Sequence, residues 1–269
     1  MAIKIWNTCI RCMNEEKGTF FAFGELSNDE YSLLHCSNGH ETKYFTVLPD
    51  YQIYFDHGID AYFDSNYFEA FTSIYHAWEQ FVSTFSEMIL IVQTGKPYSE
   101  IKEFLKGTSN NSVKLEGSFN SLFISYFSVK PPKLSNAITK LRNDIIHGKR
   151  NPEKQDVEKC MMGVYDFIKP IEIRLLTGLQ PPSPTTFFEV YANSRLESLK
   201  KEGIYTDVEL ENGDAITVQA GQYSLGRSPS TSDMQTVLEQ YDLENLLNDR
   251  KKIYKINSMM EKTYNIIDK

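Results

Sequence analysis

The sequence lacks several features that would assign the protein to a familiar class. No uninterrupted apolar run in its 269 residues approaches the ~20 residues that a membrane-spanning helix requires. The opening stretch, MAIKIWNTCIRC, has no apolar segment of the kind that secretory signals carry, so we expect a cytoplasmic protein. Positive charge is also scarce, because 36 acidic residues outnumber 28 basic ones and the formal net charge is -8. This net charge argues against a surface built broadly to coat nucleic acid, but it does not exclude a local basic site.

Cysteine is scarce too, and three of the four cysteines fall within the first 36 residues. In a cytoplasmic protein this indicates metal binding rather than disulfides. The pattern is C-x2-C, 23 residues and C-x3-H, and its candidate ligands are Cys9, Cys12, Cys36 and His40. Three thiolates and one imidazole on two short loops suit tetrahedral zinc. His35 is an alternative fourth ligand, and a set of reduced thiols near a surface histidine is the alternative to a metal site.

Residues 1–55 resemble a zinc ribbon in which histidine replaces the last of the usual four cysteines. The runs 19–23 and 43–48 look like strands, so each pair of ligands adjoins predicted β structure. Four protein ligands leave no open position for a substrate. We therefore expect a structural zinc that stabilises this domain or a recognition module.

Residues 60–178 carry apolar side chains at helical spacing and predict an α-helical bundle. The longest predicted helix, 64–93, has one broad aromatic stripe, and we expect His76 within it to be a structural histidine. Further helices are predicted over 99–107 and 116–129, from Ser135 to a point before Pro152, and over about 153–177.

The helix after Ser135 contains the sequence KLRNDIIHGKR at 140–150. Its apolar positions are four, three and four residues apart, and they predict a buried stripe of Leu134, Ile138, Leu141 and Ile145. Asn143 and His147 are one turn apart on another face, whereas Arg142 lies about 140° round the helix from His147. The arginine side chain is long enough to reach back toward the histidine.

The segment 128–154 is basic within an acidic chain. It holds seven lysines and arginines against two acids, which gives a local charge of +5. Such a contrast is typical of a phosphate-binding face, and we predict that Lys140, Lys149 and Arg150 bind substrate. The alternative is an ordinary helix end, at which His147 and Lys149 interact favourably with the helix dipole and Gly148 forms the cap.

In this context RNDIIH resembles the R-x4-H motif of HEPN-domain ribonucleases, over a span of about 62–178. The resemblance implies a metal-independent endoribonuclease of host defence, toxin–antitoxin systems or RNA processing, which dimerises so that two protomers build one composite site. It makes Arg142 and His147 the catalytic pair and places Asn143 at the polar position after the arginine. HEPN toxins that are paired with a nucleotidyltransferase antitoxin often carry tyrosine two residues after the histidine, where this chain has Lys149, so a partner that modifies such a tyrosine is not implied.

These residue types suit RNA cleavage without reference to any family. When the 2′-hydroxyl of RNA attacks the neighbouring phosphorus, a catalyst must transfer protons and stabilise negative charge. Histidine can take or give a proton near neutral pH, and arginine can donate two hydrogen bonds to phosphoryl oxygens. Asn143 can orient the imidazole or bind the phosphate. The predicted products are a 2′,3′-cyclic phosphate and a 5′-hydroxyl.

We therefore predict an endoribonuclease of antiviral defence or of a toxin system, with no metal required for catalysis. Its predicted partners are RNA, a second copy of the chain, and an antitoxin or defence-system protein, with no membrane. The alternative is a non-catalytic HEPN-like scaffold that binds RNA or protein, with the zinc ribbon as its recognition module.

Residues 185–269, after the linker PPSPTT, are predicted to form an accessory region with a hairpin and helices. A helix is expected over 186–202, and one or two more over 232–266. Between them, 206–219 predicts a hairpin whose loop, 212–214, sets Leu210 opposite Ile216 and Val208 opposite Val218. The predicted fold class is mainly α: a HEPN-like helical bundle with a small β zinc ribbon at the N-terminus and an α+β C-terminal region.

Overall fold

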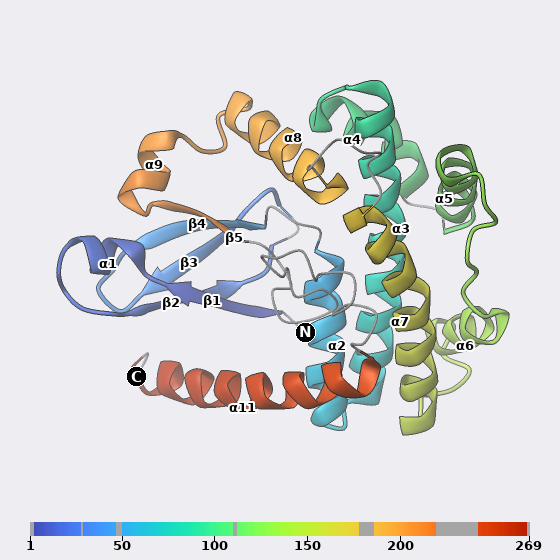
Figure 1. Ribbon diagram of the computed structural model, residues 1–269. Coiled ribbons are helices and arrows are strands. Elements are labelled where there is room, and N and C mark those ends of the chain that lie inside the picture. Colours follow the sequence, from blue (N-terminus) through green and yellow to red (C-terminus); the bar gives the residue numbers. More distant parts are fainter. Residues whose placement is uncertain are drawn as a thin grey trace. The chain divides into compact units, whose positions relative to one another are not determined.

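The computed structural model describes residues 3–27, 29–46, 50–109, 112–177, 186–218 and 242–267. Within these ranges the protein is mainly helical and contains one five-stranded sheet (Figure 1). The chain divides into two compact units, which we name the sheet unit and the helical unit. The sheet unit takes the described residues of 1–48, 195–219 and 253–269, and the helical unit takes those of 49–194 and 220–252. None of the described helices is long and apolar enough to cross a membrane.

The sheet unit is built on five strands that lie side by side in chain order. These are β1 Lys4–Thr8, β2 Phe21–Glu25, β3 Ser32–Cys36, β4 Glu41–Thr46 and β5 Ala215–Val218. The first four form an antiparallel meander, whereas β5 pairs with β4 in parallel. Because successive side chains of a strand point to opposite faces, Tyr44 packs on one face with the N-terminal cysteines, and Phe45 packs on the other with Leu199 and Tyr205.

The predicted hairpin at 206–219 is wrong. Asp207–Asn212 form helix α9, and the strand that follows pairs with β4, so Leu210 and Val208 do not face Ile216 and Val218. A capping box starts the helix: the Thr206 hydroxyl accepts the backbone N–H of Glu209 at 3.2 Å, and the Glu209 carboxylate accepts that of Thr206 at 2.8 Å. Gly213 ends it with a φ of 79°. This local capping outweighs the alternation of apolar residues.

The helical unit is arranged around its longest helix, α3. Its helices are α2 Tyr51–Phe63, α3 Tyr67–Thr94, α4 Tyr98–Ser109, α5 Ser112–Phe127, α6 Asn136–Ile146 and α7 Lys154–Thr177, with the first parts of α8 Phe187–Lys201 and α11 Leu243–Ile267. Contacts of α3 with α2, α5 and α7 bury its aromatic stripe, which confirms the helix predicted over 64–93. The rings of Trp78, Phe81 and Phe85 lie against those of Phe119 and Phe167.

An ion-pair cluster joins α11 to α2 within the helical unit. Arg250 is 8% exposed, and its guanidinium donates to both carboxylate oxygens of Asp60 and to Asp56 at 3.1 Å. The other helices expected from sequence are present within a few residues of their predicted bounds, except the helix predicted over 232–266, whose first residues, 232–241, lie outside the described residues. The linker residues 181–185 also lie outside them.

Candidate functional site

Four metal-ligand atoms meet in the sheet unit, and they belong to the residues predicted from the cysteine spacing. Cys9 and Cys12 lie at the short helix α1, Ile10–Asn14, while Cys36 ends β3 and His40 precedes β4. All four residues are buried, and their ligand atoms lie within 4.8 Å of one another. The group could bind a zinc ion, as the sequence predicted.

The spacing of these atoms fits a tetrahedral zinc site. The Sγ atoms of Cys12 and Cys36 are 3.8 Å apart, and His40 Nδ1 lies 3.5 Å from Cys9 Sγ and 3.3 Å from Cys12 Sγ. Zinc bond lengths of about 2.3 Å to sulfur and 2.0–2.1 Å to nitrogen require about 3.8 Å between two sulfurs and about 3.6 Å between sulfur and nitrogen. These three distances are close to the edges of a coordination tetrahedron, and all four ligand atoms lie within 4.8 Å of one another.

Neighbouring polar groups hold the ligands in place. Glu15 lies 3.2 Å from His40 Nε2, on the side of the ring away from the thiols, so a proton on Nε2 leaves Nδ1 free to bind a metal. Asn38 donates from Nδ2 to Cys12 Sγ at 3.2 Å. Gly39 turns the second loop with a φ of 78°. His35, the alternative ligand, is exposed and faces Glu41 at 3.4 Å instead.

The thiols differ in how readily they lose a proton. Burial raises the pKa of Cys9 to about 12. Burial also acts to raise the pKa of Cys36, but the backbone N–H groups of His40 and Asn38 favour the thiolate, and the pKa of Cys36 lies below its usual value. The fourth cysteine, Cys160, is buried in the helical unit and burial raises its pKa, as expected for a core residue.

The basic motif lies on α6 as predicted. Ser135 caps the helix, with its hydroxyl accepting the backbone N–H of Ala137 at 3.3 Å. The stripe of Leu134, Ile138 and Ile145 is buried, and Leu141 is half-buried. The helix approaches α7 closely at Gly163, where a Cβ atom would lie 2.4 Å from Ile138 Cδ1. The polar residues of the motif therefore lie on faces that the core does not use.

Arg142 is held by residues of α3. Its Nη2 atom lies 3.7 Å from Glu79 Oε1, and its guanidinium lies 5.5 Å from the centre of the Tyr75 ring. Burial, with the Glu79 carboxylate close by, raises the pKa of Tyr75 to about 12, so the ring stays neutral beneath the cation. His76, expected to be structural, has Glu79 and Gln80 as partners at 3.5 and 3.2 Å.

The motif residues are not all brought together within one chain. Arg142 Nη1 donates to Asn143 Oδ1 at 3.4 Å. His147 follows the last turn of α6 with its backbone N–H bonded to the Asn143 carbonyl at 3.0 Å, and its side chain is exposed. Among the described residues, no hydrogen bond or ion pair joins the imidazole to Arg142 or Asn143.

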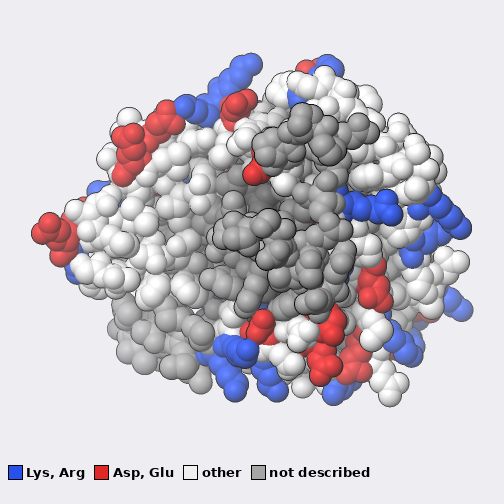
Figure 2. Space-filling model, viewed as in Figure 1, with Lys and Arg blue, Asp and Glu red and all other residues white. Residues whose placement is uncertain are grey.

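Acidic residues of α6 itself and of α7 offset part of the local positive charge. Lys149 pairs with Asp144 at 2.9 Å, and Arg150 pairs with Asp156 of α7. Within the described part of the chain, Lys140 forms no ion pair, although its charge helps to lower the pKa of Asp144. Figure 2 accordingly shows blue and red side chains interspersed on the side of the helical unit where α6 and α7 lie.

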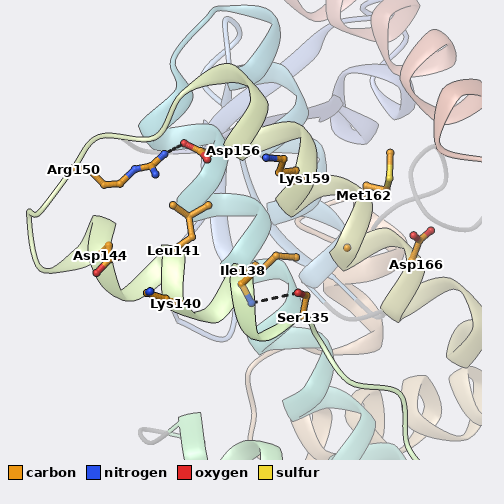
Figure 3. A pocket seen from close by; sticks show the side chains of 12 residues that line it. Ser135, Ile138, Lys140, Leu141, Asp144, Arg150, Asp156, Lys159, Met162 and Asp166 are labelled. Atoms are coloured by element: carbon orange, nitrogen blue, oxygen red, sulfur yellow. Dashed lines mark hydrogen bonds and ion pairs between the residues drawn. The ribbon is translucent and has the colours of Figure 1, made fainter.

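A groove beside the motif was not predicted. It lies between α6 and α7 and has a volume of about 620 Å³ (Figure 3). Five residues of α7 line it, and three of these are Lys159, Met162 and Asp166. Their spacing of three and four residues places them on one face beside the buried stripe of α7, and the apolar Met162 on that polar face is the sequence signal that could have revealed it.

Comparison with protein-family models gives no match. No curated protein and no solved structure matches the chain either. Function is therefore inferred from the residues of the site and their geometry.

Proposed function

We propose that the protein is a metal-independent endoribonuclease of HEPN type, in which Arg142 and His147 are the catalytic residues and Asn143 assists them. The observation that carries this proposal is that none of the three side chains belongs to the buried stripe of α6: Asn143 and the C-cap residue His147 are exposed, and Arg142 is half-buried. Arg142 is already fixed by Glu79 and Tyr75, while the His147 imidazole is open to solvent.

The reaction is an internal transfer at phosphorus. The 2′-hydroxyl gives its proton to an imidazole as its oxygen bonds to phosphorus, and the bond from phosphorus to the 5′ oxygen breaks. The departing 5′ oxygen takes a proton from an acid, which leaves a 2′,3′-cyclic phosphate and a 5′-hydroxyl. The guanidinium of Arg142 would donate to the phosphoryl oxygens as their negative charge grows.

A composite site follows from the positions of the two groups. Within one protomer they point about 140° apart round the helix, and Glu79 draws the arginine toward α3. Cleavage needs both groups at one phosphate, and each chain offers one arginine and one histidine in the motif. A two-fold dimer that apposes two α6 helices supplies two of each group. A place in antiviral defence or a toxin system, with an antitoxin or defence-system partner, follows from the family resemblance.

For the sheet unit we propose a structural zinc held by Cys9, Cys12, Cys36 and His40. A site with four protein ligands has no open position, so the metal would stabilise the fold rather than activate a water molecule. Glu15 and Asn38 would act on the ligands, by fixing the His40 ring and by donating to the Cys12 thiolate.

The experiment is an RNA cleavage assay without added metal. Purified protein is incubated with total RNA in EDTA, beside Arg142→Ala and His147→Ala, with His35→Ala as a control for loss of an exposed histidine elsewhere. We expect cleavage by wild type and by the control, no cleavage by the other two, and cyclic phosphate ends on the products.

Zinc content is measured before and after the EDTA step, so that activity lost because EDTA removed zinc from the sheet unit can be recognised. Wild-type protein that is folded, dimeric and zinc-loaded, yet cuts no RNA, would overturn the proposal. The same protein binding RNA without cutting it would favour the non-catalytic scaffold.

A further inference from the structure

The groove between α6 and α7 lies on the same side of α6 as His147. Lys140 lines the groove, and His147 follows it by seven residues, which is nearly two full turns. The two side chains therefore project within about 20° of each other, with about 10 Å of helix between them. A polynucleotide in contact with His147 that runs along this face of α6 enters the groove.

Three basic and three acidic side chains line the groove. Lys140 comes from α6 and Lys159 from α7, both are exposed, and within the described ranges neither forms an ion pair, although the charge of Lys140 acts on Asp144, which also lines the groove. Arg150 also lines the groove, but Asp156 neutralises it. Two lysines on opposite walls can therefore contact the phosphates that flank a single nucleotide.

Between the charged side chains the groove is apolar. Figure 3 shows Ile138 and Leu141 on α6, facing α7, whose Met162 is 56% exposed. Apolar side chains and a methionine sulfur suit the flat face of a nucleobase. The carboxylate of Asp166, further along α7, can accept a hydrogen bond from a base amino or imino group, which a phosphate cannot supply.

We propose that this groove binds one nucleotide of single-stranded RNA, next to the bond that is cut. The inference rests on the proposed endoribonuclease function and adds a binding subsite to it. The volume of about 620 Å³ is in the range of small-molecule sites and accommodates one nucleotide rather than a duplex. The base contacts Met162 and Leu141, while Lys140 and Lys159 hold the phosphates on either side.

The test uses a single-stranded RNA whose 2′-hydroxyls are all methylated, because it lacks the attacking group and cannot be cleaved. Its affinity is measured by fluorescence anisotropy at several salt concentrations. Wild type is compared with the double variant Lys140→Gln/Lys159→Gln and with a control, Lys102→Gln/Lys106→Gln, which removes two exposed lysines of α4.

Each phosphate contact contributes about 0.7 to the slope of log affinity against log salt for a single strand. We expect that slope to fall by about 1.4 in the groove variant and to stay unchanged in the control. Met162→Ala and Asp166→Asn should alter the preference among the four bases, measured with oligonucleotides of each base, without changing the salt slope.

An unchanged slope in the groove variant, an equal fall in the control, or no binding by wild type would overturn the groove proposal. Failure of the cleavage proposal is a separate result. In that case wild type leaves unmodified RNA intact but still binds the methylated RNA through Lys140 and Lys159. Unfolding midpoints of all variants are compared, and none is expected to shift, since each altered side chain is exposed.

Discussion

Replacing Glu172 with glutamine is expected to stabilise the helical unit at neutral and higher pH. Glu172 lies on α7, is 4% exposed, and accepts hydrogen bonds from Tyr51 and from the Gln52 amide at 3.3 Å. Burial raises its pKa to about 7, although the Tyr51 and Gln52 hydrogen bonds and the charge of Lys169 oppose this. Gln52 Oε1 is buried and has no partner among the described residues. A reoriented amide would let this oxygen accept the proton of the neutral carboxyl.

The sign of the effect follows from proton binding. Between pH 4.5, the usual pKa of a glutamate, and pH 7 the folded state keeps a proton that the unfolded chain has released. Stability contributed by this group is therefore complete below pH 4.5, falls as pH rises, and reaches its minimum above pH 7. The two pKa values differ by about 2.5, which corresponds to about 3 kcal/mol. A glutamine side chain does not titrate, so its contribution to stability does not change with pH, and it can still accept the Tyr51 hydrogen bond.

The assay is urea unfolding followed by Trp78 fluorescence in a Trp6→Phe background, because Trp78 packs against Phe167 inside the helical unit. Free energies of unfolding are measured from pH 4.5 to pH 8. The matched control is Glu158→Gln, since Glu158 lies on the same helix and accepts a tyrosine hydroxyl at 2.6 Å but is 46% exposed. The control should follow the wild-type pH curve. A Glu172→Gln variant that follows that curve as well would refute the reasoning.

Other predictions concern the metal, a cap and an ion pair. Native mass spectrometry should find one zinc per chain in wild type and in His35→Ala but none in Cys36→Ala, and zinc in all three would contradict the ligand set. Zinc affinity should also rise with pH, because the thiols lose protons when the metal binds. Thr206→Ala should lower the free energy of unfolding of the sheet unit by about 1 kcal/mol, measured by urea unfolding with Trp6 fluorescence, because α9 loses its capping box. Arg250→Met should lower the free energy of unfolding of the helical unit by about 3–5 kcal/mol in the Trp78 assay, because its aspartate partners on α2 stay half-buried without the arginine. A decrease of less than about 1 kcal/mol would argue against that ion pair.

Features that depend on neighbours in sequence were predicted well. The spacing of Cys9, Cys12, Cys36 and His40 fixed the candidate ligands, because each pair belongs to one short loop. The bounds of α6 followed from the Ser135 cap and a regular apolar stripe. Both rest on contacts within a few residues, where chain geometry leaves little choice.

Features that depend on distant contacts were missed. The partner of β5 is β4, about 170 residues earlier in the chain, and nothing in the local alternation of 206–219 reveals that pairing. Helix α2 was also not predicted. Its Gly58 is explained only by packing, since a Cβ there would lie 2.4 Å from Ile74 Cγ1 of α3.

The charge around the motif also depends on distant contacts that the sequence does not reveal. The local +5 of residues 128–154 counts only acids within the segment, whereas Glu79 of α3 and Asp156 of α7 pair with Arg142 and Arg150. Fewer basic side chains are therefore without an ion pair than the sequence indicates. Among the described residues, Lys130, Lys133 and Lys140 of the segment and Lys159 of α7 form no ion pair.

The most direct measurement of the central claim is complementation between two inactive variants. Arg142→Ala and His147→Ala are mixed in equal amounts, exchanged to form mixed dimers, and assayed for RNA cleavage beside each variant alone. If the site takes arginine from one protomer and histidine from the other, half of the dimers are mixed and each has one intact site. The account then predicts about a quarter of the wild-type rate. Mixed dimers that form but cut no RNA, while wild type cuts it, would contradict a site shared in this way.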